Sequence, residues 1–296
     1  MTVSRIRIHG VGLLAALAPT LAACGHQGGN STAVQVTIPD DPKGTVDTVV
    51  KSIADGQPVA LWAALPKSYQ HDVNELVHQF GASVDAEVYD QSFGLAKRIV
   101  GVLRDKKQFI LDHPMVGSMA DRGEVEANWD SIVGIFDTLV QSELSSTTAL
   151  KKLDVGRFLQ GTGATMMRQV ANVAKLSSED KLGQLARAQV QLVKSEGDRA
   201  SVKVTLPGER DETIELKRVE GRWIPTDMAR DWTSEIAKAK EKLKTMNGPD
   251  QKAMMQVRMG LGMANAVVGQ LEAAKTQEEF NEVLSGLMGM GLAAPR

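Results

Sequence analysis

The chain has 296 residues, of which 43% are hydrophobic and 24% are charged, and its formal net charge is −2. This length allows one large domain or two modest ones, and the composition is ordinary for a soluble globular protein. The charge is slightly acidic and no basic stripe stands out, so a nucleic-acid-binding surface is not expected.

The first 23 residues are predicted to be a signal peptide. Arg5 and Arg7 precede a short apolar run over residues 11–17, and small residues follow up to Cys24, the only cysteine. A basic start, an apolar centre and a small-residue cleavage site are typical of secretory signals. A membrane-spanning helix would need about 20 apolar residues, which this run does not supply. We therefore expect an exported protein.

The residues Leu21-Ala22-Ala23-Cys24 resemble the lipobox of bacterial lipoproteins. The resemblance implies cleavage before Cys24, a diacylglycerol on its sulfur and a further fatty acyl group, such as palmitate, on its amine. Two or more acyl chains anchor a protein stably to a membrane. Gly25, rather than Asp, follows the cysteine, which favours the outer membrane if the source is Gram-negative. With Cys24 lipidated, no thiol remains for a disulfide, a thiolate metal site or a nucleophile.

Residues 24–40 are predicted to be a flexible tether, because they are mostly polar and small. A helical region is predicted over 41–180. It opens at Asp41-Pro42, an N-cap followed by proline in the first turn. Apolar residues then recur at helical spacing. This pattern predicts helices with the following bounds: 42–55, 59–65, 68–80, 84–111, 129–144 and 153–173.

Three glycines mark weak points in these helices. The long helix over 84–111 is expected to bend near Gly94 or Gly101. The helix over 153–173 is expected to weaken at Gly161, within Gly161-Thr162-Gly163.

The hydrophobic period changes from 3.6 to 2 over residues 181–226. Apolar and polar residues alternate in several short runs that are separated by glycine-containing turns, which predicts an antiparallel meander of 3–4 strands. Helices must cover its apolar face, so the fold class is α+β and mostly helical. The inward-facing residues are predicted to be Ala188, Val190, Leu192, Val202, Val204, Ile214 and Leu216.

The chain returns to helices over residues 227–296, and 41–296 is expected to form one folded unit. Helices are predicted over 232–246, 250–275 and 277–288. The helix over 250–275 is apolar around much of its circumference, so it must be buried on more than one side. Met255, Met259 and Met263 form a stripe at i, i+4 and i+8. We refer to these three residues as the methionine stripe.

The methionine stripe has several possible partners. The favoured cover is the last helix of the same chain, through Phe280, Val283, Leu284 and Leu287. The alternative is a protein partner or a second copy of this chain, because methionine suits adaptable interfaces. Thioethers also suit copper(I).

Two stretches resemble the cone-shaped α+β fold named for nuclear transport factor two. One is the opening helix pair, from Asp41-Pro42 to Leu65-Pro66. The other is the closing hairpin, from Ile214 through Glu220-Gly221-Arg222-Trp223 to Ile224. The resemblance implies a curved sheet and carries no function, because isomerases, dehydratases and binding modules share that fold.

The chain contains one candidate for a metal site. His71, Glu75 and His78 fall at i, i+4 and i+7 and share one helix face, as metal ligands can. The exposed face of an amphipathic helix gives the same pattern, which is the favoured interpretation. No metal or cofactor is therefore predicted, and no catalytic residue stands out.

These observations predict a lipid-anchored protein of the cell envelope with a non-catalytic binding or structural role. The alternative is a small-ligand carrier or an enzyme that uses a pocket between the sheet and its helices. The predicted inner face of the sheet is entirely apolar, which favours plain packing there.

Overall fold

The computed structural model describes residues 36–114, 122–174, 181–246 and 251–292. Cys24, the predicted signal peptide and most of the predicted tether lie outside these ranges. Within them the fold is α+β and mostly helical, with one four-stranded antiparallel sheet, as the sequence predicts.

The helices before the sheet cover most of the predicted helical region. Their bounds are α2 (Pro42–Ala54), α3 (Val59–Ala64), α4 (Lys67–Ser83), α5 (Ala86–Asp105), α6 (Lys107–Leu111), α8 (Arg122–Val140), the 3₁₀ helix η1 (Glu143–Ser145), α9 (Thr147–Leu150), α10 (Val155–Gln160), α11 (Thr162–Ala174) and α12 (Lys181–Ala186).

The sheet and the C-terminal helices follow. Their bounds are β1 (Gln189–Glu196), β2 (Arg199–Thr205), β3 (Glu212–Val219), β4 (Arg222–Pro225), α13 (Thr226–Met246), α14 (Gln251–Ala273) and α15 (Gln277–Leu292). The predicted opening helix pair therefore corresponds to α2 and α3, and the predicted closing hairpin to β3 and β4. Their resemblance to the cone-shaped fold stays a prediction.

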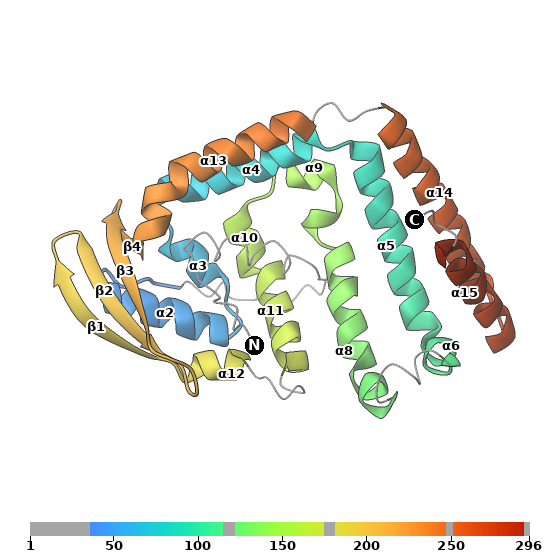
Figure 1. Ribbon diagram of the computed structural model, residues 1–296, viewed down its shortest axis with the longest axis horizontal. Coiled ribbons are helices and arrows are strands. Elements are labelled where there is room, and N and C mark those ends of the chain that lie inside the picture. Colours follow the sequence, from blue (N-terminus) through green and yellow to red (C-terminus); the bar gives the residue numbers. More distant parts are fainter. Residues whose placement is uncertain (1–35, 115–121, 175–180, 247–250, 293–296) are drawn as a thin grey trace.

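The molecule is elongated, with the sheet at one end and α14 and α15 at the other (Figure 1). The parallel pair α4 and α13 runs along one long side and joins the two ends. Below that pair, α11 packs on α8, α8 packs on α5, and α5 packs on α14. Within the described residues, the buried apolar side chains form five separate clusters along this length.

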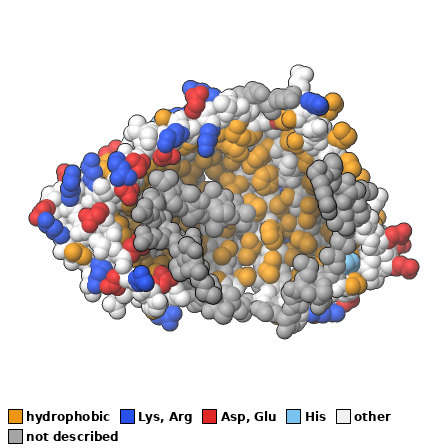
Figure 2. Space-filling view, viewed as in Figure 1, with side chains coloured by type: hydrophobic (Ala, Val, Ile, Leu, Met, Phe, Trp, Pro, Cys, Tyr) orange, Lys and Arg blue, Asp and Glu red, His pale blue; other side chains and the backbone are white. Residues whose placement is uncertain are grey.

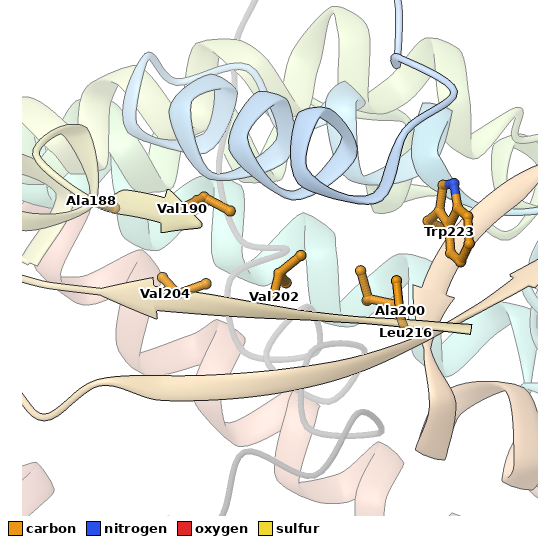
Figure 3. Close-up of a cluster of buried hydrophobic side chains, with 7 residues drawn as sticks. All are labelled: Ala188, Val190, Ala200, Val202, Val204, Leu216 and Trp223. Atoms are coloured by element: carbon orange, nitrogen blue, oxygen red, sulfur yellow. The ribbon is translucent and has the colours of Figure 1, made fainter. Parts of the chain in front are cut away.

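The sheet is a meander in the order β1-β2-β3-β4, and α2 covers its apolar face (Figure 3). The buried side chains of this face pack against Val46 and Val50 of α2. Leu192 is a correction, because its side chain is 48% exposed. Leu192 pairs with Val202 in the same register as Val190 with Val204, and the register shifts only after it, as in a β-bulge. Its exposure therefore lies where the regular pairing of β1 ends.

Local sequence signals fix several helix ends. Asp41 caps α2, because its carboxylate accepts a hydrogen bond from the Gly44 amide at 2.7 Å. Gly161 separates α10 from α11, at the weak point that the sequence predicts. The single helix predicted over 84–111 is wrong, because it is interrupted at Lys106, where α5 ends and α6 begins.

The helix α14 is held on α5 by apolar contacts and by ion pairs of two arginines, Arg98 of α5 and Arg258 of α14. Val268 and Leu271 are buried with Val102 and with Phe280 of α15. The Arg98 guanidinium donates two hydrogen bonds to the Glu272 carboxylate, at 2.9 and 2.7 Å. The expected cover by the last helix therefore holds for the C-terminal half of α14.

Candidate functional site

An apolar cavity of about 610 Å³ lies among the helices in the middle of the molecule. Its walls come from α3, α4, α5, α8, α9, α10 and α13, and from the segments that join them. Apart from Trp62 and Tyr89, the lining side chains are aliphatic residues, phenylalanines and one methionine. Small-molecule sites have volumes of about 300–1,000 Å³, so this cavity is large enough for a ligand.

In the space-filling view, apolar side chains gather over the middle of the face that is drawn, whereas charged side chains lie around its periphery (Figure 2). Exposed apolar residues on α5, α8 and α11 include Ile99, Ile132, Phe136 and Val170. Apolar patches of this kind mark binding surfaces more often than scattered apolar residues do.

The periodicity of α4 turns one of its faces toward the cavity. Val73, Val77 and Phe80 are spaced at i, i+4 and i+7, and all three line the cavity. The sequence predicts this apolar face, but periodicity alone does not distinguish a face that packs against a core from one that lines a cavity.

Polar residues on another face of α4 hold the start of α10. The Asn74 side-chain oxygen accepts a hydrogen bond from the Val155 amide at 3.0 Å. The Nε2 atom of His78 lies 2.9 Å from the Leu153 carbonyl oxygen, within hydrogen-bond distance. These contacts place Leu153 and Val155 in the cavity wall.

Two side chains of α5 fix the opposite wall. The Tyr89 hydroxyl donates a hydrogen bond to the Leu144 carbonyl at 2.7 Å. The Asp90 carboxylate accepts one from the Thr147 amide, at the start of α9, at 2.9 Å. Burial, with a smaller contribution from Asp90, raises the pKa of Tyr89 to about 12. Tyr89 is therefore neutral at physiological pH, and its hydroxyl proton is donated to the Leu144 carbonyl.

A groove between α4 and α13 adjoins this cavity. Val73, Val77, Phe80 and Met228 line both, so the two spaces share a wall. Trp232 of α13 lies in the groove, and its indole N–H donates a hydrogen bond to Asp72 of α4 at 2.9 Å.

The predicted metal candidates do not form a metal site. His71 is exposed, and the Nδ1 atom of His78 lies 3.9 Å from the nearest Glu75 oxygen. Across the described residues, no group of three His, Cys, Asp or Glu side chains is arranged to hold a metal ion. The contact between His78 and Leu153 gives His78 a structural role.

The position of the cavity differs from the pocket that the sequence suggests. The apolar face of the sheet is filled by its own cluster and by α2, as Figure 3 shows. The cavity lies among the helices instead. It was missed because its lining comes from segments between residues 61 and 228, whose proximity no local pattern reveals.

The methionine stripe is exposed in the structure. The side chains of Met255, Met259 and Met263 are 64%, 59% and 57% exposed. The favoured prediction that the last helix covers them is wrong, because all three side chains are exposed. The same segment of α14 contacts α5 through Arg258, which pairs with Asp85 and Glu87. The last helix packs instead around Val268 and Leu271, through Phe280, Val283 and Leu284. The side chain of Leu287 is not among those that the structure describes.

None of the helices in the described ranges is long and apolar enough to cross a membrane. Comparisons with protein-family models, with curated proteins and with solved structures find no match to this chain.

Proposed function

We propose that this chain is a lipid-anchored protein of the bacterial cell envelope that binds an apolar molecule in its helical cavity and does not catalyse a reaction. The observation that carries the proposal is the cavity of about 610 Å³ with its almost wholly apolar lining. Such a lining selects a ligand by the apolar surface that it removes from water, at about 0.8 kcal/mol for each buried CH₂ group.

The polar groups near the cavity support a binding role. Tyr89, Asn74 and His78 all make hydrogen bonds within the scaffold, so they hold the walls in place. None of the lining residues carries a carboxylate, an imidazole or an amine that would act as an acid or a base.

The proposed location rests on the sequence. The residues Leu21-Ala22-Ala23-Cys24 support lipidation at Cys24, export and attachment to the outer membrane if the source is Gram-negative. A lipid-anchored protein with an apolar cavity is well placed to hold a molecule that partitions poorly into water.

The test uses residues 25–296, which contain every described helix and strand. Binding of the uncharged probe N-phenyl-1-naphthylamine is followed by its fluorescence. We expect saturable binding to one site. The substitution Val77→Trp places a larger side chain in the cavity wall and should weaken binding by at least about tenfold, equivalent to about 1.4 kcal/mol.

The matched control is Val193→Trp, because Val193 is 59% exposed on β1 and lies far from the cavity lining. This variant should bind the probe as the parent protein does. Circular dichroism melting shows whether both variants fold. Absence of saturable binding to the parent protein, or equal binding by two folded variants, would contradict the proposal.

A second role is supported by the exposed methionine stripe. An apolar helix face that the rest of the chain leaves uncovered is typical of a protein interface. The proposed partner of this face is a second copy of the chain, and the corresponding prediction is given in the Discussion.

A further inference from the structure

The groove between α4 and α13 has a regular apolar face with one lysine toward the C-terminal end of α13. On α13 the lining residues Met228, Trp232, Ile236, Ala239 and Lys242 follow one another at steps of three or four, so they lie along one side of the helix. The groove therefore runs lengthwise between the two helices. It adjoins the cavity along much of its length, because the α4 residues Val73, Val77 and Phe80 line both.

The polar side-chain groups around Trp232 in the groove already have hydrogen-bond partners. The indole N–H of Trp232 is bonded to Asp72, and its ring stacks on Tyr69 with the centroids 3.9 Å apart. Trp232 is almost completely buried. This part of the groove therefore offers apolar contact rather than hydrogen bonds.

The two charged residues that line the groove differ in their partners. The Glu235 carboxylate accepts a hydrogen bond from Lys238 at 2.6 Å. Lys242 is exposed, and its ammonium group has no acidic partner among the residues that the structure describes. Within the described groove, the uncompensated charge is therefore positive and lies toward the C-terminal end of α13.

The length of the groove suits one fatty acyl chain. Met228 and Lys242 are fourteen residues apart on α13, which corresponds to about 21 Å along the helix axis. The hydrocarbon core of a bilayer is about 30 Å thick and holds two layers of acyl chains, so one chain reaches roughly 15 Å. A chain of this length with its polar end at Lys242 therefore extends along the groove to about Trp232, beside the cavity.

We infer that the ligand is a single-chain anionic amphiphile, whose acyl chain lies in the cavity and the α4–α13 groove and whose carboxylate or phosphate pairs with Lys242. This inference rests on the proposed binding function and adds the class of ligand and its orientation. A neutral apolar molecule satisfies the proposed function but leaves Lys242 without a partner.

The experiment compares two fluorescent probes that share one acyl chain, cis-parinaric acid and its methyl ester. Residues 25–296 should bind the acid about fivefold more tightly at neutral pH and low salt, which is equivalent to about 1 kcal/mol. Higher ionic strength should reduce this preference, because the head group lies near solvent.

Two pairs of variants locate the head group and the chain. Lys242→Gln should abolish the preference for the acid, whereas Lys244→Gln should not, because Lys244 is paired with Glu241 and does not line the groove. Ala239→Trp should weaken binding of both probes. The control Ala237→Trp changes an exposed neighbour outside the groove lining and should have no effect.

The outcomes separate the two proposals. If the parent protein binds neither the uncharged naphthylamine probe nor either parinaric probe, the proposed function itself fails. If it binds the acid and the ester equally, or if Lys242→Gln keeps the preference, only the present inference is overturned. Unchanged binding by a folded Ala239→Trp variant would also overturn it.

Displacement of cis-parinaric acid then distinguishes the sources of the anionic head group. Displacement by palmitate supports a free fatty acid, and displacement by lysophosphatidylglycerol supports a lysolipid with a phosphate. Equal displacement by the zwitterionic lysophosphatidylcholine would show that the charge is not recognised and would contradict the role of Lys242.

Discussion

The substitution Val202→Asp tests the packing of the sheet most directly. Val202 is 0% exposed and lies in β2, between Leu192 of β1 and Ile214 of β3. Its side chain packs in the cluster that α2 covers. An aspartate at this position places a carboxylate without a partner in an apolar environment.

The expected loss of stability is large. An uncompensated buried charge costs about 3–5 kcal/mol, against a total free energy of unfolding of about 5–15 kcal/mol for a typical domain. A chain of this size loses about 2–4 °C in melting temperature for each kcal/mol. We therefore expect Val202→Asp to lower the melting temperature by about 6–20 °C at pH 7.

The loss should depend on pH in a definite direction. Burial raises the pKa of the new carboxyl group in the folded state above its unfolded value of about 3.9. Between these two pKa values the folded state binds more protons, so the free energy of unfolding falls as pH rises. Relative to Val202→Asn, which carries no charge, the aspartate variant should be least impaired near pH 4 and should worsen toward pH 7.

Melting temperatures followed by circular dichroism between pH 4 and pH 8 check this reasoning. Lys203→Gln serves as the neighbouring control, because its side chain faces away from the core and pairs with Asp211 at the surface. That change should cost no more than about 1 kcal/mol. The reasoning is refuted if Val202→Asp and Lys203→Gln have the same melting temperature. It is also refuted if the melting temperatures of Val202→Asp and Val202→Asn depend on pH in the same way.

Four further predictions concern other parts of the chain. Cys24→Ser should abolish incorporation of a palmitate analogue in metabolic labelling, and equal labelling of both proteins would exclude the lipobox. Gly81→Ala should lower the melting temperature, because a Cβ atom there would lie 2.8 Å from the Cβ of Leu150. Gly94→Ala should instead raise it, since nothing lies within 4 Å of that position and alanine stabilises an exposed helix interior by about 0.8–1.0 kcal/mol. Replacing the methionine stripe with glutamine should convert a dimer into a folded monomer in light-scattering measurements. A parent protein that is already monomeric would contradict the proposed interface.

Much of the fold could be predicted from local signals in the sequence. Asp41-Pro42 starts α2, Gly161 separates α10 from α11, and the change to period 2 marks the sheet, because each of these signals acts within a few residues. The exposure of Leu192 could not be predicted, because alternation shows which face a side chain is on but not whether another element covers it there. The break at Lys106 could not be predicted either, because neither glycine nor proline lies at or next to that position.

The candidate site was less accessible to sequence reasoning. The spacing of Val73, Val77 and Phe80 indicates an apolar helix face, but whether that face meets side chains or empty space depends on distant helices. His78 is a second example. Its spacing from His71 suited an exposed helix face, the favoured interpretation, or a metal ligand, whereas its contact with the Leu153 carbonyl, 75 residues away in the chain, could not be predicted from either.

The separation of the apolar core into clusters has a consequence for how the molecule opens. The end formed by α14 and α15 has one apolar cluster, and its ion pairs to α5, Arg98–Glu272 and Arg258 with Asp85 and Glu87, are exposed to solvent. The sheet at the opposite end has a cluster of its own. Cooperativity between units of this kind passes only through the elements that they share. Amide hydrogens of α14 should therefore exchange through a local opening of low free energy, whereas those of β2 should exchange only when the whole protein unfolds. We therefore expect local unfolding to be most frequent at the end that carries the exposed methionines, and rare in the sheet.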